Sequence, residues 1–364
     1  MSKGMIVTTV ATFAVAALPI TAAAQTTAYH VTDLGAAAGA ASCVPTAIND
    51  AGAVAGSCAN DGLSNSGVVV WRDGTLVSLG VLPGGHSAYA TAINSLGVVS
   101  ADGDTGNYQP RPLVASNGAL LNMDPQGGAN MHTVGITDAG VVFGSYAKGL
   151  SGNTSAWSAV FWAEEAGKPG RYRRTALSGI PGGDAKANST IALGSNKAGQ
   201  AAGWVTSSLF GQLGAFWNND AQHSIVALAP LTGAYWSIAT GINDLGQAIG
   251  QSGTASFEYH GVLWQNDDAH TPIDLGTLPN DTASTAVAAN TAGQVVGASW
   301  SSAAGQRAFL WQRGQMTELA SLVDPLDGFW TIDSVFGINN AGQIIGIGSS
   351  NGRSTAVLLT PTAR

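Results

Sequence analysis

The sequence predicts an all-β fold: a seven-bladed β-propeller of four-stranded antiparallel blades, closed into a ring by its own N-terminal strand. Three observations lead to it. A turn-containing segment recurs seven times, two strand-like segments follow it in a fixed order, and the last of these also occurs before the first turn but not after the seventh. A repeat of about 48 residues with four strands is within the range of propeller blades.

The first recurring segment has small residues leading to Ile-Asn or a variant, then a turn, then an apolar run that mostly ends in Gly. Asn and Asp bond their own backbone in turns, and apolar runs on both sides indicate a β-hairpin. The copies are AINDAGAVAG (47–56), AINSLGVVS (92–100), GITDAGVVFG (135–144), GSNKAGQAAG (194–203), GINDLGQAIG (241–250), AANTAGQVVG (288–297) and GINNAGQIIG (337–346).

The second segment is a short apolar strand that usually ends in Trp, and the third is a strand resembling Asp-Leu-Gly. Seven copies of the second occur, at 68–71, 112–115, 159–162, 215–217, 262–264, 308–311 and 356–359. Six copies of the third follow them, at 77–80, 120–123, 176–179, 226–228, 273–276 and 317–319. We expect the Trp side chains between neighbouring sheets, where an aromatic ring buries most area.

The missing seventh copy of the third segment lies at the N-terminal end, as Val31 to Leu34 before the first turn. A ring explains both irregularities, because this strand then forms the outer edge of the last blade, beside residues 356–359. A linear stack gives no reason for them to match. The closure makes the strand before each Ile-Asn the innermost. The period itself is also compatible with six or eight blades, and the number of copies gives seven.

Composition agrees with an all-β protein and argues against nucleic acid as a partner. The 364 residues include 49 Gly and only 10% charged residues, with four Glu against 18 Asp, so good helix-surface residues are scarce. The formal charge of −8, with 14 basic residues, does not suit a phosphate-binding surface.

Residues 1–24 read as a secretory signal peptide, followed by a single propeller domain over residues 25–364. Lys3 gives a positive start, residues 5–21 are mostly apolar, and Ala22-Ala23-Ala24 fits a cleavage site. A membrane anchor is the alternative, but the apolar stretch is short. No other stretch is long enough to span a bilayer, so we expect a mature protein without a membrane span, either secreted to the extracellular space or periplasmic.

The two cysteines, Cys43 and Cys58, flank the first turn. If the loop is the four residues 49–52, Ile48 faces Ala53 and Cys43 faces Cys58. In an exported protein this predicts a disulfide within one blade. A three-residue loop with a bulge would shift the register and separate the two cysteines.

The segments GINNAGQIIG, RAFLW (307–311) and PIDLGTLP (272–279) together resemble the HAF-repeat family of probable extracellular bacterial proteins. The family is named for His-Ala-Phe before Leu-Trp, and here the corresponding triplets include His-Gly-Val at 260–262 and Arg-Ala-Phe at 307–309. The resemblance covers essentially the whole mature chain. It implies export and a repeated β architecture, and it transfers no catalytic residue.

Catalytic and metal-binding motifs are weak. The G-x-S-x-G match at 348–352 lies between two β-strands, whereas a nucleophile elbow needs a strand and a helix. Residues 102–107 (DGDTGN) resemble part of a calcium loop but lack its closing Glu, so a structural loop is the simpler interpretation. Lys168, Arg171, Arg173 and Arg174 form a basic cluster opposite Glu164 and Glu165, which we interpret as a self-paired hairpin. No cofactor and no metal site are assigned.

The connections from each outer strand to the next inner strand should emerge on one face, where a rigid scaffold commonly presents binding residues. We predict a ligand-binding face there, with polysaccharide or a cell-surface protein as the partner and no catalysis. The alternative is a polysaccharide lyase or hydrolase using His86, His132 and Asp184. Trp236 and Trp330 could instead fill gaps between blades. The candidate residues are His86, Tyr89, His132, Asp184, Tyr235, Trp236 and Trp330.

Overall fold

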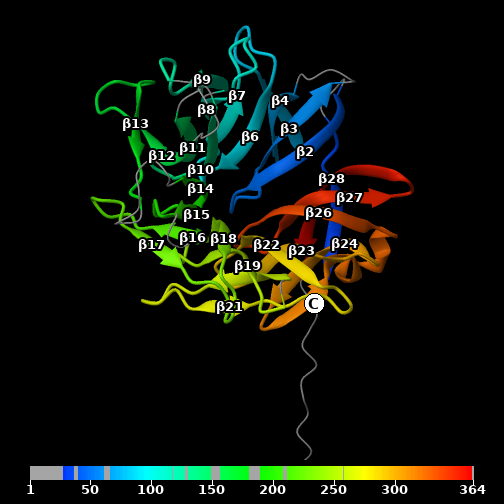
Figure 1. Cartoon of the computed structure of the whole chain (residues 1–364). Helices are drawn as coiled ribbons and strands as arrows, with labels where there is room; N and C mark the ends of the chain where they lie inside the picture. Colours follow the sequence, from blue (N-terminus) through cyan, green and yellow to red (C-terminus); the bar gives the residue numbers. More distant parts are fainter. Residues whose placement is uncertain are drawn as a thin grey trace, which may run out of the picture.

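The computed structural model describes residues 28–36, 40–60, 66–116, 118–127, 130–148, 156–179, 189–207, 211–256 and 258–362. In this part of the chain, seven four-stranded antiparallel sheets stand around a central axis (Figure 1), as predicted. No described helix is long and apolar enough to cross a membrane. The predicted signal peptide, residues 1–24, lies outside the described residues.

Each blade has an inner, a second, a third and an outer strand, in chain order except that the outer strand of blade 7 comes from the N-terminal end. Blades 1 to 6 are β2–β5, β6–β9, β10–β13, β14–β17, β18–β21 and β22–β25, and blade 7 is β26, β27, β28 and β1. The inner strands are β2 (Ala40–Ile48), β6 (Ala88–Ile93), β10 (Met131–Ile136), β14 (Thr190–Ser195), β18 (Ser237–Ile242), β22 (Ala283–Ala289) and β26 (Thr331–Ile338). The second strands are β3 (Val54–Asn60), β7 (Val99–Gly103), β11 (Val142–Lys148), β15 (Ala201–Ser207), β19 (Ala248–Gly253), β23 (Val295–Ser301) and β27 (Ile344–Ser350).

The remaining strands contain the two other recurring segments. The third strands are β4 (Ser66–Arg72), β8 (Arg111–Ser116), β12 (Ala156–Glu164), β16 (Gly211–Trp217), β20 (Tyr259–Trp264), β24 (Gly305–Gln312) and β28 (Arg353–Pro361). The outer strands are β5 (Thr75–Gly80), β9 (Ala119–Asn122), β13 (Tyr172–Ala176), β17 (Ile225–Leu228), β21 (Pro272–Asp274), β25 (Gln315–Glu318) and β1 (Tyr29–Asp33). Two short 3-10 helices, η1 (Leu319–Leu322) and η2 (Pro325–Asp327), connect β25 to β26.

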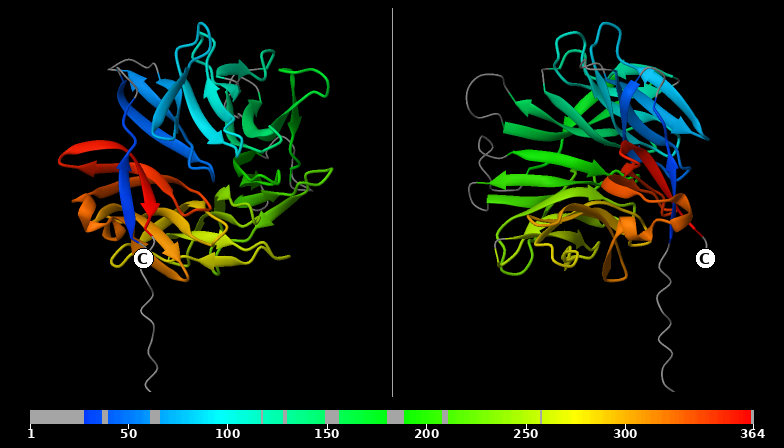
Figure 2. Two further views of the ribbon diagram at one scale, coloured as in Figure 1. Left: turned by 180° about the vertical axis from the view of Figure 1, so that it is seen from behind. Right: turned by 90° about the vertical axis from the view of Figure 1, so that its right-hand side faces the viewer.

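The N-terminal strand closes the ring as predicted. β1 pairs antiparallel with β28, with Val31 opposite Leu359, so strands from the two ends of the chain lie side by side (Figure 2). The strand itself spans Tyr29–Asp33, and Leu34 follows it with its amide bonded to the carbonyl of Ala356. η2 secures the strand from the other side, because the Asp327 carboxylate accepts a 2.7 Å hydrogen bond from the amide of Val31.

A ring of asparagine amides joins the turns of neighbouring blades. In six of the seven blades, the residue after the inner strand is a buried Asn whose position in the turn is the same. Its side-chain amide donates to the backbone carbonyl of the equivalent residue in the next blade, at 3.0 or 3.1 Å. The donors and acceptors are Asn49 to Asn94, Asn94 to Thr137, Asn196 to Asn243, Asn243 to Asn290, Asn290 to Asn339, and Asn339 to Asn49.

Asn243 shows why this residue recurs. Its Oδ1 accepts the amides of Leu245 and Gln247 within the turn, and its Nδ2 donates to Gln247 Oε1 and to the carbonyl of Asn290. All four hydrogen-bonding positions of the buried amide are therefore used, which a buried polar group requires. The ring lacks one bond, from blade 3 to blade 4, because Thr137 has no amide to donate.

The glycine that ends most of the turn segments allows the inner strand to approach. Every inner strand bulges near its middle, for example between Ala239 and Gly241, so one residue points out of register. At this point a methyl group on Gly250 would overlap the carbonyl oxygen of Ile238. Equivalent overlaps occur at Gly56, Gly144, Gly203, Gly297 and Gly346. The bulge and the glycine are thus parts of one packing arrangement.

Trp side chains of the third strands lie in the core between sheets, as predicted. Trp217 and Trp264 are fully buried and contact hydrophobic residues of two successive blades. Their indole N–H groups donate to the carbonyls of Ser178 and Ala229, both at 2.8 Å. Burial of a large ring with its one polar atom bonded joins each pair of sheets.

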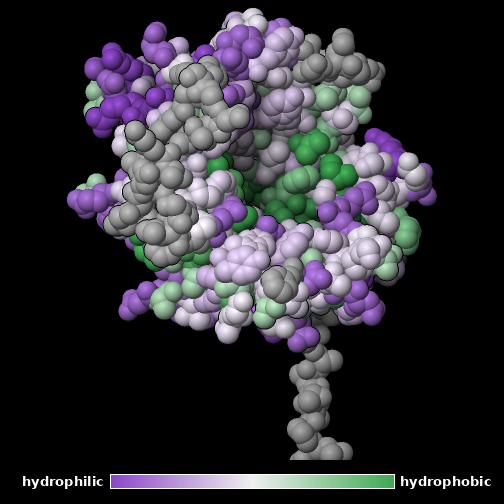
Figure 3. Space-filling view, in the orientation of Figure 1, coloured by the Kyte–Doolittle hydropathy of each residue, from purple (hydrophilic) through white to green (hydrophobic). Residues whose placement is uncertain are grey.

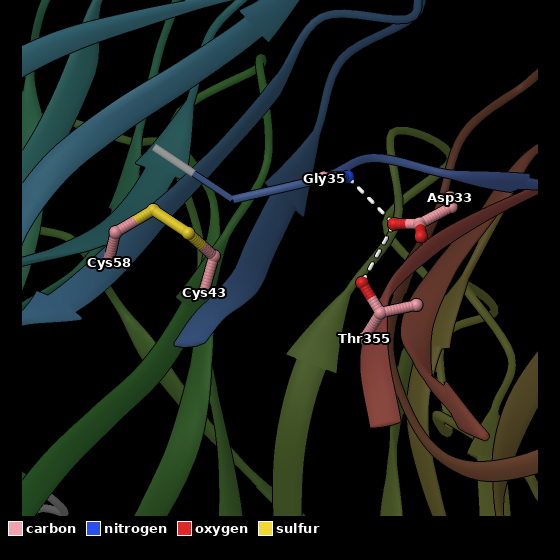
Figure 4. Close-up of a disulfide and its surroundings, with 5 residues drawn as sticks. All are labelled: Asp33, Gly35, Cys43, Cys58 and Thr355. Atoms are coloured by element: carbon pink, nitrogen blue, oxygen red, sulfur yellow. Dashed lines mark hydrogen bonds between the residues drawn. A yellow bond between two sulfur atoms is a disulfide. The ribbon is translucent and has the colours of Figure 1, made fainter. Parts of the chain in front are cut away.

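The disulfide between Cys43 and Cys58 forms as predicted, although the register behind the prediction is wrong. Ile48 pairs with Val54 rather than Ala53, which by itself would move Cys43 out of line. A bulge between Pro45 and Ala47 restores the alignment, so that Cys43 pairs with Cys58 (Figure 4). The loop and the bulge each shift the register by one residue, and the two shifts cancel.

A polar contact joins the third and outer strands in three blades. At equivalent positions near the start of the third strand, Thr355 donates to Asp33 at 2.7 Å (Figure 4), His260 bonds Asp274 at 2.9 Å, and Arg307 pairs with Glu318 at 3.0 Å. The acceptor comes from the Asp-Leu-Gly segment or its equivalent. In these three blades the contact joins the two strands that contain the recurring segments.

Removing the disulfide should destabilise the fold. The bond closes a loop of 15 residues, for which the loss of chain entropy in the unfolded state contributes on the order of 3 kcal/mol. Reduction with dithiothreitol and the Cys43→Ser/Cys58→Ser substitution should each lower the free energy of unfolding by about this value. Chemical denaturation measures both effects, and the two should agree. Two titratable thiols in the unreduced, unfolded protein would contradict the disulfide.

Completing the asparagine ring should stabilise the protein. Thr137→Asn supplies the missing amide donor toward Asn196 and should raise the free energy of unfolding by about 1 kcal/mol, the net value of one hydrogen bond. Asn243→Ala should lower it by at least about 2 kcal/mol, because buried partners lose their bonds. Gln315→Ala, which removes an exposed side-chain amide of an outer strand, is the matched control and should change little. A Thr137→Asn variant no more stable than wild type would argue against the ring as a source of stability.

Candidate functional site

The two faces of the ring differ. The turns with the asparagine ring form one face, which we call the turn face. The connections between blades and the hairpins between second and third strands form the other, the loop face. Six of the sequence-predicted residues lie in these connections or at the strand starts that follow them: His86, Tyr89, His132, Tyr235, Trp236 and Trp330. Asp184 lies outside the described residues. Figure 3 shows that the molecule is hollowed at its centre, with hydrophobic residues in the hollow.

His132 forms a pair with Asp102 between blades 2 and 3. Nδ1 of His132 lies 3.1 Å from Oδ2 of Asp102, and Oδ1 accepts the amide and hydroxyl of Thr133 at 2.7 and 2.9 Å. The hydrogen bond to Asp102 raises the pKa of His132, and burial raises the pKa of Asp102 despite the opposing effect of its bonds. Because Nδ1 is held by the carboxylate, Nε2 remains to exchange a proton, and about half of the His132 side chain is exposed.

His86 forms a second pair of this kind. Its Nδ1 lies 3.0 Å from Asp104, and its ring stacks on Tyr108 with the centroids 3.9 Å apart. Asp104 also accepts the amides of His86, Ser87 and Gly106. Burial alone would raise the pKa of Asp104, but these hydrogen bonds outweigh it and hold the pKa well below the ordinary value.

The two carboxylates of these pairs, Asp102 and Asp104, both belong to the segment that resembles a calcium loop. Asp102 bonds to blade 3, whereas Asp104 bonds to the connection that leads into its own blade, so each carboxylate has its own set of donors. Among the described residues, no group of three or more His, Cys, Asp or Glu side chains could hold a metal ion. His86 and His132 are thus tied to two different carboxylates.

An aromatic cluster crosses from blade 5 to blade 6 on the loop face. The ring of Trp236 lies 6.1 Å from that of Tyr259, which lies 5.1 Å from Trp300 in an edge-on arrangement. Tyr235, next to Trp236, is 67% exposed. We refer to these four residues as the blade 5/6 cluster. Tyr235 and Trp236 are predicted from the sequence, whereas Tyr259 and Trp300 are not, because the prediction covers only the connections between blades. The hairpins between second and third strands emerge on the same face and supply the other two.

Trp330 packs between η2 and the strands of blade 7. This agrees with the second interpretation offered for this residue, that it fills a gap rather than binds a ligand. Trp330 packs on the hydrophobic cluster of blade 7, and its indole N–H donates to the carbonyl of Asp327 at 3.1 Å. Gly348 leaves the space for its ring, since a methyl group there would come within 3.3 Å of it. We therefore place Trp330 with the packing residues.

The axial channel contains a cavity of about 360 Å³ near the turn face. All seven blades line it, with the ends of their inner strands and the turns that follow, and none of the sequence-predicted residues is part of its wall. Lys197 of blade 4 crosses this end, with Nζ 2.5 Å from Asp50 of blade 1 and 3.0 Å from Asp244 of blade 5. Burial alone would lower the pKa of Lys197, but these two carboxylates raise it.

Two weak motifs of the sequence have ordinary structural roles. In the basic hairpin, Lys168 and Arg171 pair with Glu165 at 2.7 and 3.3 Å, which confirms self-pairing. Arg174 instead pairs with Asp124 at 2.9 Å and lies over the ring of Tyr146. The G-x-S-x-G match lies at the β27–β28 hairpin, and the Ser350 hydroxyl donates to the carbonyl of Phe329.

The His132–Asp102 pair should make stability depend on pH. The pKa of His132 is raised above its ordinary value of 6.5, so the folded protein holds this proton more tightly than the unfolded chain. The stabilisation is fully present below about pH 6.5 and is lost as pH rises through the raised pKa. An NMR titration of His132 should give a midpoint above that of a free histidine, and Asp102→Asn should lower it. An unshifted midpoint in the wild-type protein would contradict the pairing.

No protein-family model matches the chain, and no curated protein matches it at a significant level. Solved β-propellers resemble it at low sequence identity. A prolyl endopeptidase gives a TM-score of 0.57 at 9% identity, covering 93% of this chain and 51% of the peptidase, so the chain spans about half of that protein. YCF48 bound to a D1 peptide gives 0.53 at 12% identity, covering 92% of this chain and 96% of YCF48.

The β-propeller domain of the Trilobed protease from Pyrococcus furiosus, described as having an open velcro topology, gives a TM-score of 0.52 at 12% identity. That similarity covers 77% of this chain and 84% of the protease domain. At these identities the similarity concerns the fold and carries no activity with it. The chain is a seven-bladed β-propeller of four-stranded antiparallel blades.

Proposed function

We propose that this chain is an exported binding propeller whose loop face recognises an extracellular carbohydrate or a cell-surface ligand without chemically changing it. One observation carries the proposal: aromatic side chains are exposed on the loop face of a scaffold held rigid by the asparagine ring and the buried Trp residues. Tyr and Trp supply large contact area at little entropic cost and keep a polar atom for hydrogen bonding. Among the predicted aromatic residues, which all lie in the described part of the chain, Tyr89 and Tyr235 are the most accessible, at 47% and 67% exposed.

Export is part of the proposal. A disulfide persists in oxidising compartments outside the cytoplasm, and Cys43 and Cys58 form one here. The signal-like residues 1–24 and the resemblance to the HAF-repeat family point the same way.

A lyase or hydrolase is the second candidate, and the His132–Asp102 pair favours it. A half-exposed imidazole with its Nδ1 held by a buried carboxylate can take a proton at Nε2. Tyr89 lies opposite Asp102 in the register of β6 and β7 and could serve as the second acid–base group. Asp184, the third residue of this hypothesis, lies outside the described residues.

Retention and cleavage should be measured together. The mature protein is incubated with extracellular polysaccharides, peptidoglycan and peptides, and we expect retention on at least one of them without released fragments. Tyr89→Ala/Tyr235→Ala removes exposed rings from the loop face and should weaken retention, because ligand contacts are lost while the core is untouched.

The matched control is Leu96→Ala/Leu245→Ala, which removes exposed side chains from the turn face; these leucines are 72% and 52% exposed. It should bind like the wild type. If the wild-type protein releases fragments and the His132→Ala variant does not, the protein is an enzyme and the proposal of a non-catalytic binding module is wrong. Absence of both retention and fragments, or equal retention by the Tyr89→Ala/Tyr235→Ala variant, would reject the proposed role of the loop face.

A further inference from the structure

Tryptophans of this chain differ in what their indole N–H groups contact. Trp162, Trp217, Trp264 and Trp330 each donate to an oxygen of the protein, so their N–H groups are already used. Within the described part of the chain, Trp157, Trp204, Trp236, Trp300 and Trp311 have no such bond, and none of their N–H groups is a buried atom lacking a partner. Of these five, Trp236 and Trp300 belong to the blade 5/6 cluster. These two N–H groups are therefore open to a ligand, together with the hydroxyls of Tyr235 and Tyr259.

The blade 5/6 cluster is also held in place. The carbonyl of Trp236 accepts bonds from the Ser252 hydroxyl and the Gly253 amide, at 3.1 and 3.2 Å. The carbonyl of Trp300 accepts the amide of Thr282 at 3.1 Å. A methyl group on Gly253 would come within 2.7 Å of Trp236 Nε1, so the indole lies directly against this glycine. Rings fixed before binding lose little entropy when a ligand arrives.

Charge near the cluster limits the class of ligand. Two basic side chains lie in this region, and both are already paired: Arg307 is shared between Asp281 and Glu318, each at 3.0 Å, and His260 is bonded to Asp274 at 2.9 Å. Burial would lower the pKa of Arg307, but the carboxylates of Asp281 and Glu318 raise it, so the guanidinium stays charged. Glu258, next to Tyr259, is exposed and negative. An anionic chain would meet no unpaired cation among these residues and would be repelled by Glu258.

We propose that the blade 5/6 cluster is a binding site for an uncharged glycan, whose sugar rings stack on Trp236, Tyr259 and Trp300. The C–H groups on the face of a pyranose ring are weakly positive and suit the negative face of an aromatic ring. The sugar hydroxyls accept from the free indole N–H groups and bond to the tyrosine hydroxyls. This inference rests on the proposed binding function and names its site and ligand class.

Affinity electrophoresis tests the site. The mature protein is run through native gels that contain a neutral glycan, such as mixed-linkage β-glucan or glucomannan, or an anionic one, such as alginate or polygalacturonate. We expect retardation by at least one neutral glycan and none by the anionic ones. Tyr259→Ala and Trp300→Ala should each weaken binding by about tenfold or more. Gly253→Ala should weaken it by displacing the indole of Trp236, and Tyr259→Phe should retain most of it.

Tyr108→Ala is the matched control, because it removes an exposed ring that stacks on His86 in blade 2. It should bind like the wild type, and thermal unfolding confirms that each variant is folded. Neutral-glycan binding that survives Tyr259→Ala and Trp300→Ala but is lost in Tyr89→Ala would keep the binding function and overturn this site. Retardation by anionic glycans alone would overturn the ligand class. A wild-type protein retained by peptides and by no glycan would overturn this inference and leave the loop face as a protein-binding surface.

Discussion

The hydrogen bond from each asparagine amide to the next blade's turn is the contact on which this ring depends. A propeller blade cannot bury both faces of its sheet alone, so its stability comes from its neighbours. The asparagine does two things at once: its oxygen shapes its own turn, and its amide donates to the following blade. Register within the hairpin and position within the ring are thereby set by one side chain. The buried Trp residues fill the space between sheets that this spacing defines.

The bulge in each inner strand connects the scaffold to the channel. It turns one residue out of register and brings the strand's carbonyl so close to the second strand that only glycine fits opposite it in six blades. The same bulge aligns the two cysteines in blade 1. Blade 4, whose asparagine receives no amide from Thr137, is tied instead across the channel by Lys197 to Asp50. Where the asparagine ring lacks one bond, a different contact across the channel therefore joins blade 4 to another blade.

The loop face combines rigid support with variation. Its residues follow strands whose other ends are fixed by the asparagine ring, so differences between connections do not disturb the blades. The His86–Asp104 and His132–Asp102 pairs lie at blades 2 and 3, and the blade 5/6 cluster, with the His260–Asp274 pair beside it, lies at blades 5 and 6. These are two distinct chemical environments on one face. Proton exchange suits the first and stacking with hydrogen bonding suits the second, which is why separate variants can distinguish an enzyme from a binding module.

The sequence by itself determined the architecture. Seven turn segments, seven third strands and one displaced Asp-Leu-Gly strand were enough to predict seven blades and their closure, because a repeated local pattern has few ways to bury itself. It also gave the Cys43–Cys58 disulfide, although through a register that the Pro45–Ala47 bulge then had to correct. Bulges of this kind depend on how closely two strands approach, which no single segment specifies.

Only the tertiary structure decided which side chains meet between blades. The asparagine ring, the Lys197–Asp50 pair and the His132–Asp102 pair join residues 30 to 290 positions apart. Trp236 and Trp330 occupy equivalent connections and look alike in the sequence, yet one has an open indole N–H and the other is bonded and packed. The difference arises from neighbours supplied by other strands, and local sequence carries no record of them.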